Sequence, residues 1–183
     1  MIKEEIIKAE KHPFDAWEDL VRASREGFAS IQPENFLRFR WFGLYQQRPK
    51  SDPYFMLRLK IPGGRVNSKQ LRAVAETAEK YGRGIADITT RQNFQFHWIT
   101  VEDIPGIFKK FEALGITTKG GGGDTARNIT SSPLAGLEAD EVDDLEDVIL
   151  ELQEALLAKK SRTNLPRKFK VSITGSPKNI AQP

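Results

Sequence analysis

The segment Thr89–Trp98 combines a strand pattern with a cluster of hydrogen-bond donors. Its second part alternates Phe94, Phe96 and Trp98 with polar residues, as a half-buried strand does. Its first part reads Thr-Thr-Arg-Gln, and a strand needs none of these side chains for its own stability. An anion with several oxygens would use all of them, because guanidinium and hydroxyl groups donate to oxyanions. The segment therefore predicts an anion site.

Further cations stand in short motifs along the chain. Arg58 and Lys60 fall on one face of a predicted strand, and Lys168 and Lys170 fall on one face of another. Arg127 follows a run of four glycines, at residues 120–123. For any one of these motifs a solvated surface is the usual state of Lys and Arg, so only their combination suggests a site.

Composition limits the function classes. The chain has 183 residues, 39% hydrophobic and 29% charged, which is typical of a globular protein. The net charge of +3 is too small to indicate a nucleic-acid partner, and no apolar run is long enough for a membrane span. No export signal is evident, so we expect a cytoplasmic protein. There is no cysteine and there are two distant histidines, so we predict no metal site built from this chain.

The order of predicted elements suggests a mixture of helices and strands. We expect a helical arm at residues 1–30 and a strand at 36–43, together forming an N-terminal region of 1–49. Residues 50–117 then read strand, helix, strand, helix, with strands at 54–61 and 85–99 and with Phe96 and Trp98 in the core. Connections of this length predict parallel pairing in a small α/β layer. Residues 118–183 would contain an acidic helix start at 138–146, with Val148 on the apolar face, and a strand at 166–173.

Four motifs, in this order, resemble the sirohaem and 4Fe–4S assimilatory nitrite and sulfite reductases. They are Tyr-Phe-Met-Leu-Arg-Leu-Lys-Ile-Pro-Gly-Gly, Asp-Ile-Thr-Thr-Arg-Gln-Asn-Phe-Gln-Phe-His-Trp-Ile, Arg-Asn-Ile-Thr-Ser-Ser-Pro-Leu-Ala-Gly and Leu-Pro-Arg-Lys-Phe-Lys-Val-Ser-Ile. The resemblance spans about residues 36–183 and is to the N-terminal half of the ferredoxin-dependent enzymes. It implies an α+β fold, with a ferredoxin-like α/β half-domain followed by the start of a sirohaem-domain α/β unit.

The resemblance also implies residue roles in the six-electron reduction of nitrite to ammonia, or of sulfite to sulfide. Arg58, Arg127, Lys168 and Lys170 would bind the oxyanion and relay protons, since a desolvated lysine among cations has a lowered pKa. The cofactor-binding residues, which would contact sirohaem carboxylates, would be Thr89, Arg91, Gln95 and Asn128. His97 is more simply explained by a structural hydrogen bond. The motifs do not separate nitrite from sulfite.

In the family, cysteines of the second half hold the cluster and the haem iron. Ser176 and Ile180 stand where such a cysteine motif would stand, so residues 118–183 are interpreted as a cysteine-free first copy that ends within a domain. The chain alone is then expected to be inactive. Its implied partners are the C-terminal half, a ferredoxin-like electron donor and a second copy of this chain covering an apolar face.

Two questions stay open from the sequence alone. The first is function: a non-catalytic fragment, or a module that binds tetrapyrrole carboxylates or anions, would carry the same basic motifs. The second concerns the glycines at 120–123, which suit a flexible linker, an anion cradle of backbone amides or a close approach of the backbone.

Overall fold

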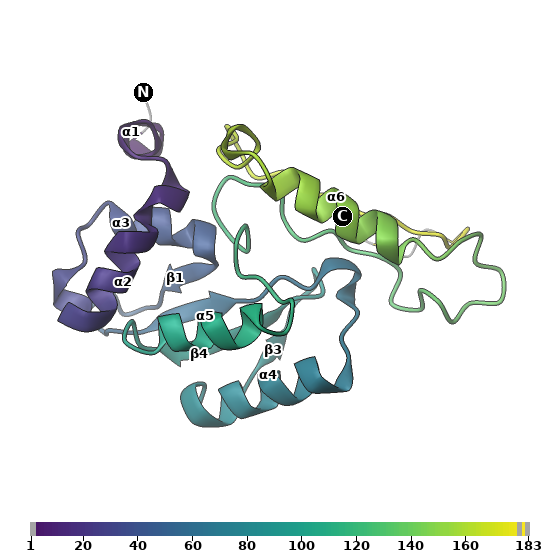
Figure 1. Cartoon of the computed structure of the whole chain (residues 1–183), viewed down its shortest axis with the longest axis horizontal. Coiled ribbons are helices and arrows are strands. Elements are labelled where there is room, and N and C mark those ends of the chain that lie inside the picture. The colour runs from purple at the N-terminus through teal and green to yellow at the C-terminus, as the bar shows by residue number, and fades with distance from the viewer. Residues whose placement is uncertain (1–2, 179–180, 182–183) are drawn as a thin grey trace.

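The computed structural model describes residues 3–178 and 181. In this part of the chain the α-helices are α1 (Lys3–Glu10), α2 (Trp17–Glu26), α3 (Asn35–Arg38), α4 (Ser68–Tyr81), α5 (Ile104–Glu112) and α6 (Glu146–Leu157). The strands are β1 (Leu44–Gln46), β2 (Phe55–Arg58), β3 (Asp87–Ile88) and β4 (Phe94–Ile99). Short 3-10 helices cover Pro13–Ala16, Phe28–Ser30, Phe39–Phe42, Pro62–Gly64 and Lys160–Arg162. Helices α1–α3 lie at one end of the molecule and α6 at the other (Figure 1). The fold is the expected mixture of helices and sheet.

The strands form one sheet in the order β1-β2-β4-β3, and every neighbouring pair is antiparallel. The prediction of parallel pairing was therefore wrong, because the expected strand at 85–99 is two strands joined by a turn. The Thr89 hydroxyl accepts hydrogen bonds from the backbone N–H groups of Arg91 and Asn93 and so closes this turn. Gln92 takes a positive φ of 56° in it. The donor-rich motif is thus a turn that reverses the chain, and β4 inserts between β2 and β3.

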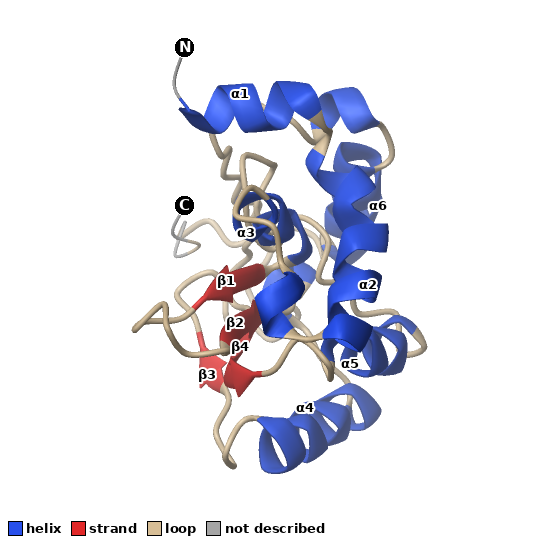
Figure 2. Cartoon of the chain, turned by 90° about the vertical axis from the view of Figure 1, so that its left-hand side faces the viewer, coloured by secondary structure: helices blue, strands red, loops and turns tan. Residues whose placement is uncertain are grey.

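One face of the sheet is covered by helices, and the other carries the polar side chains. In β2, Phe55 and Leu57 are fully buried while Met56 and Arg58 are half-buried. The Phe96 ring of β4 stacks on Phe111 of α5, with ring centroids 6.0 Å apart. Figure 2 shows α2, α4 and α5 on the same side of the strands. Strand alternation places Arg58 on the opposite, helix-free face.

A β-bulge changes the alternation in β4. The register runs from Phe55 opposite Ile99 to Leu57 opposite Phe96, so two residues of β4 face one residue of β2. Trp98 takes a positive φ of 62° at this point. As a result Ile99 turns into the core, and Trp98 is half-buried instead of being a core residue as predicted.

The segment 36–43, predicted as a strand, is helical. Leu37 and Trp41, four residues apart, face Ile7 of α1 in a small apolar cluster. Phe39 and Phe42, three residues apart, face the main core on the other side. Apolar residues spaced three and four apart on two faces indicate a helix. When the residues of both faces are taken together, the pattern looks like the alternation of a strand.

The second half of the chain is less regular than expected. Helix α6 starts only at Glu146, and it buries Ile149 and Gln153, whereas Val148 is exposed. The predicted strand at 166–173 is reduced to isolated parallel bridges, which pair Phe169 with Ala126 and Ser172 with Thr130.

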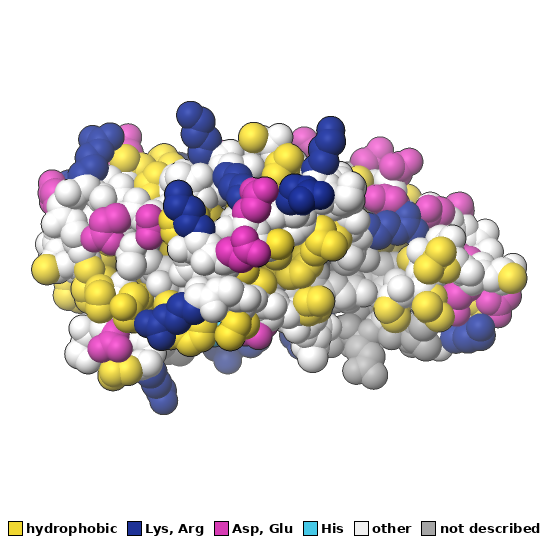
Figure 3. Space-filling view, turned by 90° about the horizontal axis from the view of Figure 1, so that it is seen from below, with side chains coloured by type: hydrophobic (Ala, Val, Ile, Leu, Met, Phe, Trp, Pro, Cys, Tyr) yellow, Lys and Arg dark blue, Asp and Glu magenta, His cyan; other side chains and the backbone are white. Residues whose placement is uncertain are grey.

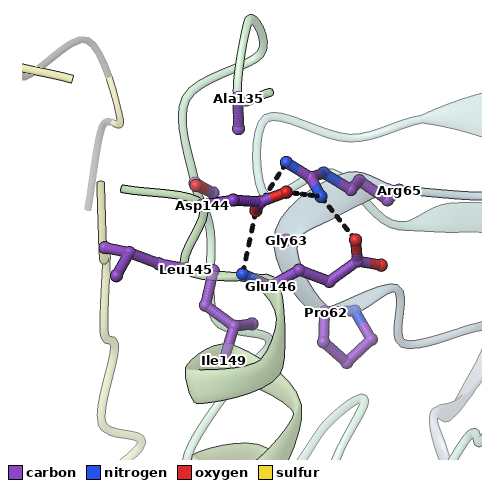
Figure 4. Close-up of a pocket in the computed structure, with 9 residues that line it drawn as sticks. Pro62, Gly63, Arg65, Ala135, Asp144, Leu145, Glu146 and Ile149 are labelled. Atoms are coloured by element: carbon purple, nitrogen blue, oxygen red, sulfur yellow. Dashed lines mark hydrogen bonds and ion pairs between the residues drawn. The ribbon is translucent and has the colours of Figure 1, made fainter. Parts of the chain in front are cut away.

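Arg65 fixes the acidic segment that precedes α6. Its guanidinium makes ion pairs with both Asp144 and Glu146, and Asp144 also accepts the backbone N–H of Glu146 (Figure 4). These bonds raise the pKa of the Arg65 guanidinium and lower that of the Asp144 carboxyl. The small pocket that these residues line holds only about 10 Å³. We assign it a structural role, as a clamp between the Pro62–Gly64 turn and α6.

The N-terminal arm contacts the second half directly. Lys8 of α1 is 3% exposed, and its ammonium donates to the Asp124 carboxylate at 3.1 Å and to the Leu165 carbonyl at 3.2 Å. The Trp41 indole N–H donates to the Thr163 carbonyl at 2.6 Å. These buried contacts between distant segments fix the second half on the arm.

The four glycines at 120–123 are buried, which rules out a flexible linker and favours close approach. A Cβ on Gly122 would lie 2.3 Å from the Arg40 carbonyl oxygen, and one on Gly123 would lie 2.3 Å from the Trp41 ring. Two of the four amides are used internally, since Gly120 donates to the Trp41 carbonyl and Gly121 to the Thr118 carbonyl. The run therefore passes through a space that only backbone can fill.

Apolar side chains also remain at the surface. Leu71, Ile85 and Ile88 are 50%, 52% and 76% exposed. Seen from below, apolar groups lie between charged side chains (Figure 3). Whether a second copy covers any of this surface stays a prediction. Within residues 3–178, no helix has the length and apolar character needed to cross a membrane.

We predict opposite effects for two glycine substitutions. Gly122→Ala should lower the free energy of unfolding by more than about 2 kcal/mol, because the new methyl group overlaps backbone that cannot move away. Gly106→Ala in α5 meets no atom within 4 Å and should stabilise the chain by about 0.5–1 kcal/mol through helix propensity. Urea denaturation of both variants checks this. Equal effects would contradict the close approach.

A second prediction concerns Lys60, which has no exposed surface. Burial, with smaller contributions from the charges of Arg127 and Arg91, lowers its pKa from 10.5 to about 7. Below about pH 7 the folded chain bears the whole cost of the buried charge. Between 7 and 10.5 the unfolded chain binds more protons than the folded one, so stability from this group rises with pH.

Lys60→Met should therefore raise the free energy of unfolding more at about pH 6 than at about pH 9, by roughly 2–3 kcal/mol. Denaturation curves at the two pH values, with wild type and with the exposed-site variant Lys109→Met as control, measure the difference. A pH-independent effect of Lys60→Met would contradict a titrating buried lysine.

Candidate functional site

A cleft of about 670 Å³ lies on the helix-free face of the sheet. It is lined by Tyr45, Met56, Arg58, Thr89, Thr90, Arg91, Asn93, Gly121, Arg127, Asn128, Lys168 and Lys170. Seven of the eight residues predicted for the site are in this lining, although they come from β2, the β3–β4 turn and two segments of the second half. The exception is Gln95, which lies behind Arg58.

Gln95 orients Arg58. The two residues are directly opposite each other on β4 and β2. The side-chain amide oxygen Oε1 of Gln95 accepts from Nε of Arg58 at 2.9 Å and from Nη2 at 2.5 Å. Nη1 of Arg58 donates to the Gly121 carbonyl at 3.1 Å. All three guanidinium nitrogens are thus held, which fixes the group in one orientation.

Arg127 also hydrogen-bonds to the Gly121 carbonyl. Its Nη1 donates to the Gly121 carbonyl oxygen at 3.0 Å and to the Tyr45 hydroxyl at 3.3 Å. The Arg58 guanidinium lies 5.5 Å from the centre of the Tyr45 ring. Burial lowers the pKa of Arg58, and the charge of Arg127 acts in the same direction. Two guanidinium groups are therefore held side by side, which is a geometry that suits an oxyanion.

Sequence reasoning did not identify Tyr45. Its strand β1 has only three residues, too few for alternation to show which side chains face the cleft. Pairing with Met56 in the register of β1 and β2 is what places the ring there.

Arg91 bridges two backbone segments and keeps free donors. Its Nη2 donates to the Asn128 carbonyl at 2.5 Å and to the Val171 carbonyl at 2.9 Å. Its Nε and Nη1 atoms are buried and have no hydrogen-bond partner among the residues that the structure describes. Burial lowers the pKa of this guanidinium, followed by the charge of Arg127. Buried N–H groups without an acceptor are costly, so these two point to an acceptor supplied by a ligand.

Like Arg91, Asn128 bonds to neighbouring backbone and also has a buried polar atom that a ligand could use. It is 1% exposed, and its amide donates to the Ile61 carbonyl at 2.7 Å and to the Arg91 carbonyl at 2.9 Å. Its Oδ1 and Nε of Arg127 are buried, and within the described part of the chain neither atom has a hydrogen-bond partner. The side chain thus secures the turn that carries Arg91.

Lys168 and Lys170 are exposed at the edge of the cleft. The backbone between them is attached to the neighbouring segment, since Arg127 N–H donates to the Phe169 carbonyl at 2.8 Å and Phe169 N–H donates to the Thr125 carbonyl at 3.1 Å. Their side chains are free to move toward an anion in the cleft, unlike the two fixed arginines.

The glycine run does not act as an amide cradle at this site. It presents the Gly121 carbonyl to the two arginines, so its contribution is a negative dipole that gathers cations. His97 makes hydrogen bonds away from the cleft lining, with its Nδ1 3.0 Å from the Gln47 amide and its Nε2 3.1 Å from an Asp87 oxygen. These are structural hydrogen bonds of the kind the sequence suggested.

Within the described residues no group of three or more His, Cys, Asp or Glu side chains could hold a metal ion. Ser176 is 6% exposed, and its hydroxyl accepts the backbone N–H of Lys178. Ile180, the other position of the predicted cysteine-free motif, lies outside the described residues.

Known proteins match both halves of the chain. The family described as nitrite/sulfite reductase ferredoxin-like half domain matches residues 47–114, and the nitrite and sulphite reductase 4Fe-4S domain matches residues 122–183. An assimilatory ferredoxin-dependent nitrite reductase of Haloferax mediterranei is 38% identical over 96% of this chain and 33% of its own length. A ferredoxin–nitrite reductase of Leptolyngbya laminosa is 41% identical over 94% of this chain and 35% of its own length.

A solved structure agrees. The NirA protein of Mycobacterium tuberculosis superimposes with a TM-score of 0.89 at 34% identity, covering 94% of this chain and 35% of that one. This chain spans about a third of the length of the relatives it matches. Its two matched domains, in this order and with this fold, place it in a single family: the chain belongs to the nitrite and sulfite reductases.

Proposed function

We propose that this chain supplies the N-terminal half of a sirohaem-dependent reductase that converts nitrite to ammonia, or sulfite to sulfide, and that the cleft binds the oxyanion and the cofactor carboxylates. The observation that supports this most is the sharing of the Gly121 carbonyl by Arg58 and Arg127. Two fixed guanidinium groups beside two mobile lysines suit a small oxyanion, since each charge-assisted hydrogen bond favours the bound anion.

The residues present fit an acidic cofactor. Sirohaem carries many carboxylates, and the unpartnered buried N–H groups of Arg91 and Arg127 are donors that such carboxylates would satisfy. Arg91 and Thr90 line one side of the cleft and would hold the periphery of the ring. When bound, this group would pass electrons to the substrate. The residues of this chain would bind the oxyanion, orient it and deliver protons to its oxygens.

Gln95 and Asn128 act through the arginines in this proposal. Gln95 fixes Arg58, and Asn128 fixes the turn with Arg91, so both would be positioning residues. Lys168 and Lys170 are the flexible members, suited to follow an anion whose oxygens are removed during reduction. The chain has no cysteine for an iron or a cluster, so turnover would require the remaining part of a family enzyme and an electron donor such as ferredoxin.

The second candidate is a module that binds anions or tetrapyrrole carboxylates without catalysis. The same cleft supports it, and the absence of cysteine in the sequence favours it for the chain taken alone. Joining this chain to the remaining two thirds of a family nitrite reductase separates the two candidates, since only the first leads to reduction of nitrite by a reduced dye.

We predict that the isolated chain binds nitrite in the cleft. Arg127→Ala should weaken binding by about 10–100-fold, because it removes a charge-assisted donor worth about 1.5–3 kcal/mol. The control is Arg22→Ala on α2, whose exposed guanidinium pairs with Asp19 and should leave affinity unchanged. Isothermal titration calorimetry measures both. Equal losses of nitrite affinity in the two variants would mean that the effect comes only from the change in net charge.

For Arg91 we expect a different selectivity. Arg91→Ala should weaken binding of uroporphyrin, a soluble porphyrin with carboxylates around its ring, by at least about tenfold, and should change nitrite affinity less than Arg127→Ala does. Fluorescence of the porphyrin gives its affinity, and the melting temperature of the variant reveals any loss of the Asn128 and Val171 contacts. Uroporphyrin bound equally well by a folded Arg91→Ala variant would show that Arg91 is not a cofactor contact.

A further inference from the structure

Lys60 is a buried lysine that has no carboxylate partner among the described residues. It lies two residues after the end of β2, its backbone N–H donates to the Thr117 carbonyl at 2.8 Å, and its side chain has no exposed surface. The ammonium nitrogen has one recorded partner within the described residues, the Ala126 carbonyl oxygen at 3.3 Å. Lys8 is a useful contrast, because it is also buried but pairs with the carboxylates of Glu5 and Asp124.

The partner of Lys60 belongs to the backbone that positions the site. Ala126 precedes Arg127 and forms a parallel bridge with Phe169, which stands between the two cleft lysines. Nζ of Lys60 would lie 3.2 Å from a Cβ placed on Gly120, so the glycine run passes directly over it. The ammonium thus supports the segment that carries Arg127, from the side opposite the cleft.

Both positive and negative side chains surround Lys60, but they do not affect its pKa equally. Arg127 and Arg91 are the charges that lower its pKa, after burial. Arg65 and Glu146 line one groove beside Lys60, and Glu154 of α6 lines the other. The two acidic side chains are exposed and Glu146 is paired with Arg65, so neither neutralises the buried ammonium.

We propose that Lys60 is a positioning residue that couples anion binding in the cleft to protonation of its own amine beneath it. The inference rests on the proposed function of the cleft. An anion between Arg58 and Arg127 offsets the positive charges that oppose protonation of Lys60. The neutral amine then takes a proton from water and becomes an ammonium, and by reciprocity the protonated chain binds the anion more tightly.

This coupling would place a proton next to a reaction that consumes protons. With a pKa of about 7, Lys60 is partly neutral at neutral pH and can gain charge on binding. A pKa lowered by desolvation among cations was expected for Lys168 and Lys170. Both of these lysines are exposed, whereas Lys60 is the desolvated lysine. If binding raises the pKa by about one unit, nitrite affinity should be about fivefold higher at about pH 6 than at about pH 8.

The test follows lysine protonation by NMR of the wild-type chain labelled with ¹³C at the lysine ε-carbons. Lys60→Met identifies the Lys60 signal. Nitrite is the probe because it stays ionised throughout the neutral range, and sodium chloride at equal ionic strength is the control. We expect one lysine to titrate near neutral pH and its midpoint to move upward with nitrite. The Lys8 signal, assigned with Lys8→Met, should titrate at high pH and should not move.

Calorimetry in two buffers of different ionisation enthalpy supplies the second measurement. Wild type and the exposed-site variant Lys109→Met should take up a fraction of a proton per nitrite bound at pH 7, and Lys60→Met should take up none. A Lys60 signal that titrates with the other lysines, or a midpoint that stays fixed while nitrite shifts the Arg127 amide signal, would overturn the coupling alone. Absence of any nitrite-dependent shift at Arg127 would overturn the proposed function of the cleft and the coupling with it.

Discussion

Two guanidinium groups that share one carbonyl oxygen are the centre of this structure. Arg58 and Arg127 repel each other, and they stay together because Gly121 directs its carbonyl between them while Gln95 and Tyr45 hold their outer sides. The carbonyl can reach this place only because the glycine run lies against other backbone. A Cβ on Gly121 would be 2.9 Å from the Thr118 carbonyl and 3.0 Å from the Arg58 carbonyl. The absence of four side chains is thus what allows two cations to converge.

The remainder of the fold keeps that backbone in position. The Gly120 N–H donates a hydrogen bond to the Trp41 carbonyl, and the Trp41 indole donates one to the Thr163 carbonyl. Lys8 donates to Asp124, which directly follows the glycine run, so the N-terminal region holds this run in place. From the side opposite the cleft, Lys60 contacts the carbonyl of Ala126, three residues after the glycine run. Buried polar contacts of this kind cost much when a single partner is lost, because the other partner stays desolvated. The arm is therefore part of the scaffold of the cleft, although none of the residues of α1 lines it.

The sequence was informative where a local pattern had one physical meaning. The mixture of strands and helices in residues 50–117 followed from spacing alone, and the basic motifs predicted most of the cleft lining. It failed where two faces were mixed in one pattern, as at residues 36–43, and where a turn was composed of residues that also suit strands, as at Thr89–Asn93. The roles of Gln95 and Lys60 depend on which residues lie opposite them, and no single-strand pattern contains that information.

The bulge at His97 and Trp98 makes β4 a strand with two phases. Before it, even-numbered residues such as Phe96 face the helices, and after it odd-numbered residues such as Ile99 do so. Simple alternation through β4, without the bulge, would instead place the Trp98 indole opposite Phe55, where Ile99 now lies. An insertion next to it would turn the start of the connection to α5 outward. The length of this strand is thus as constrained as its composition, and tolerance of insertions must be sought in the loops on either side of the sheet.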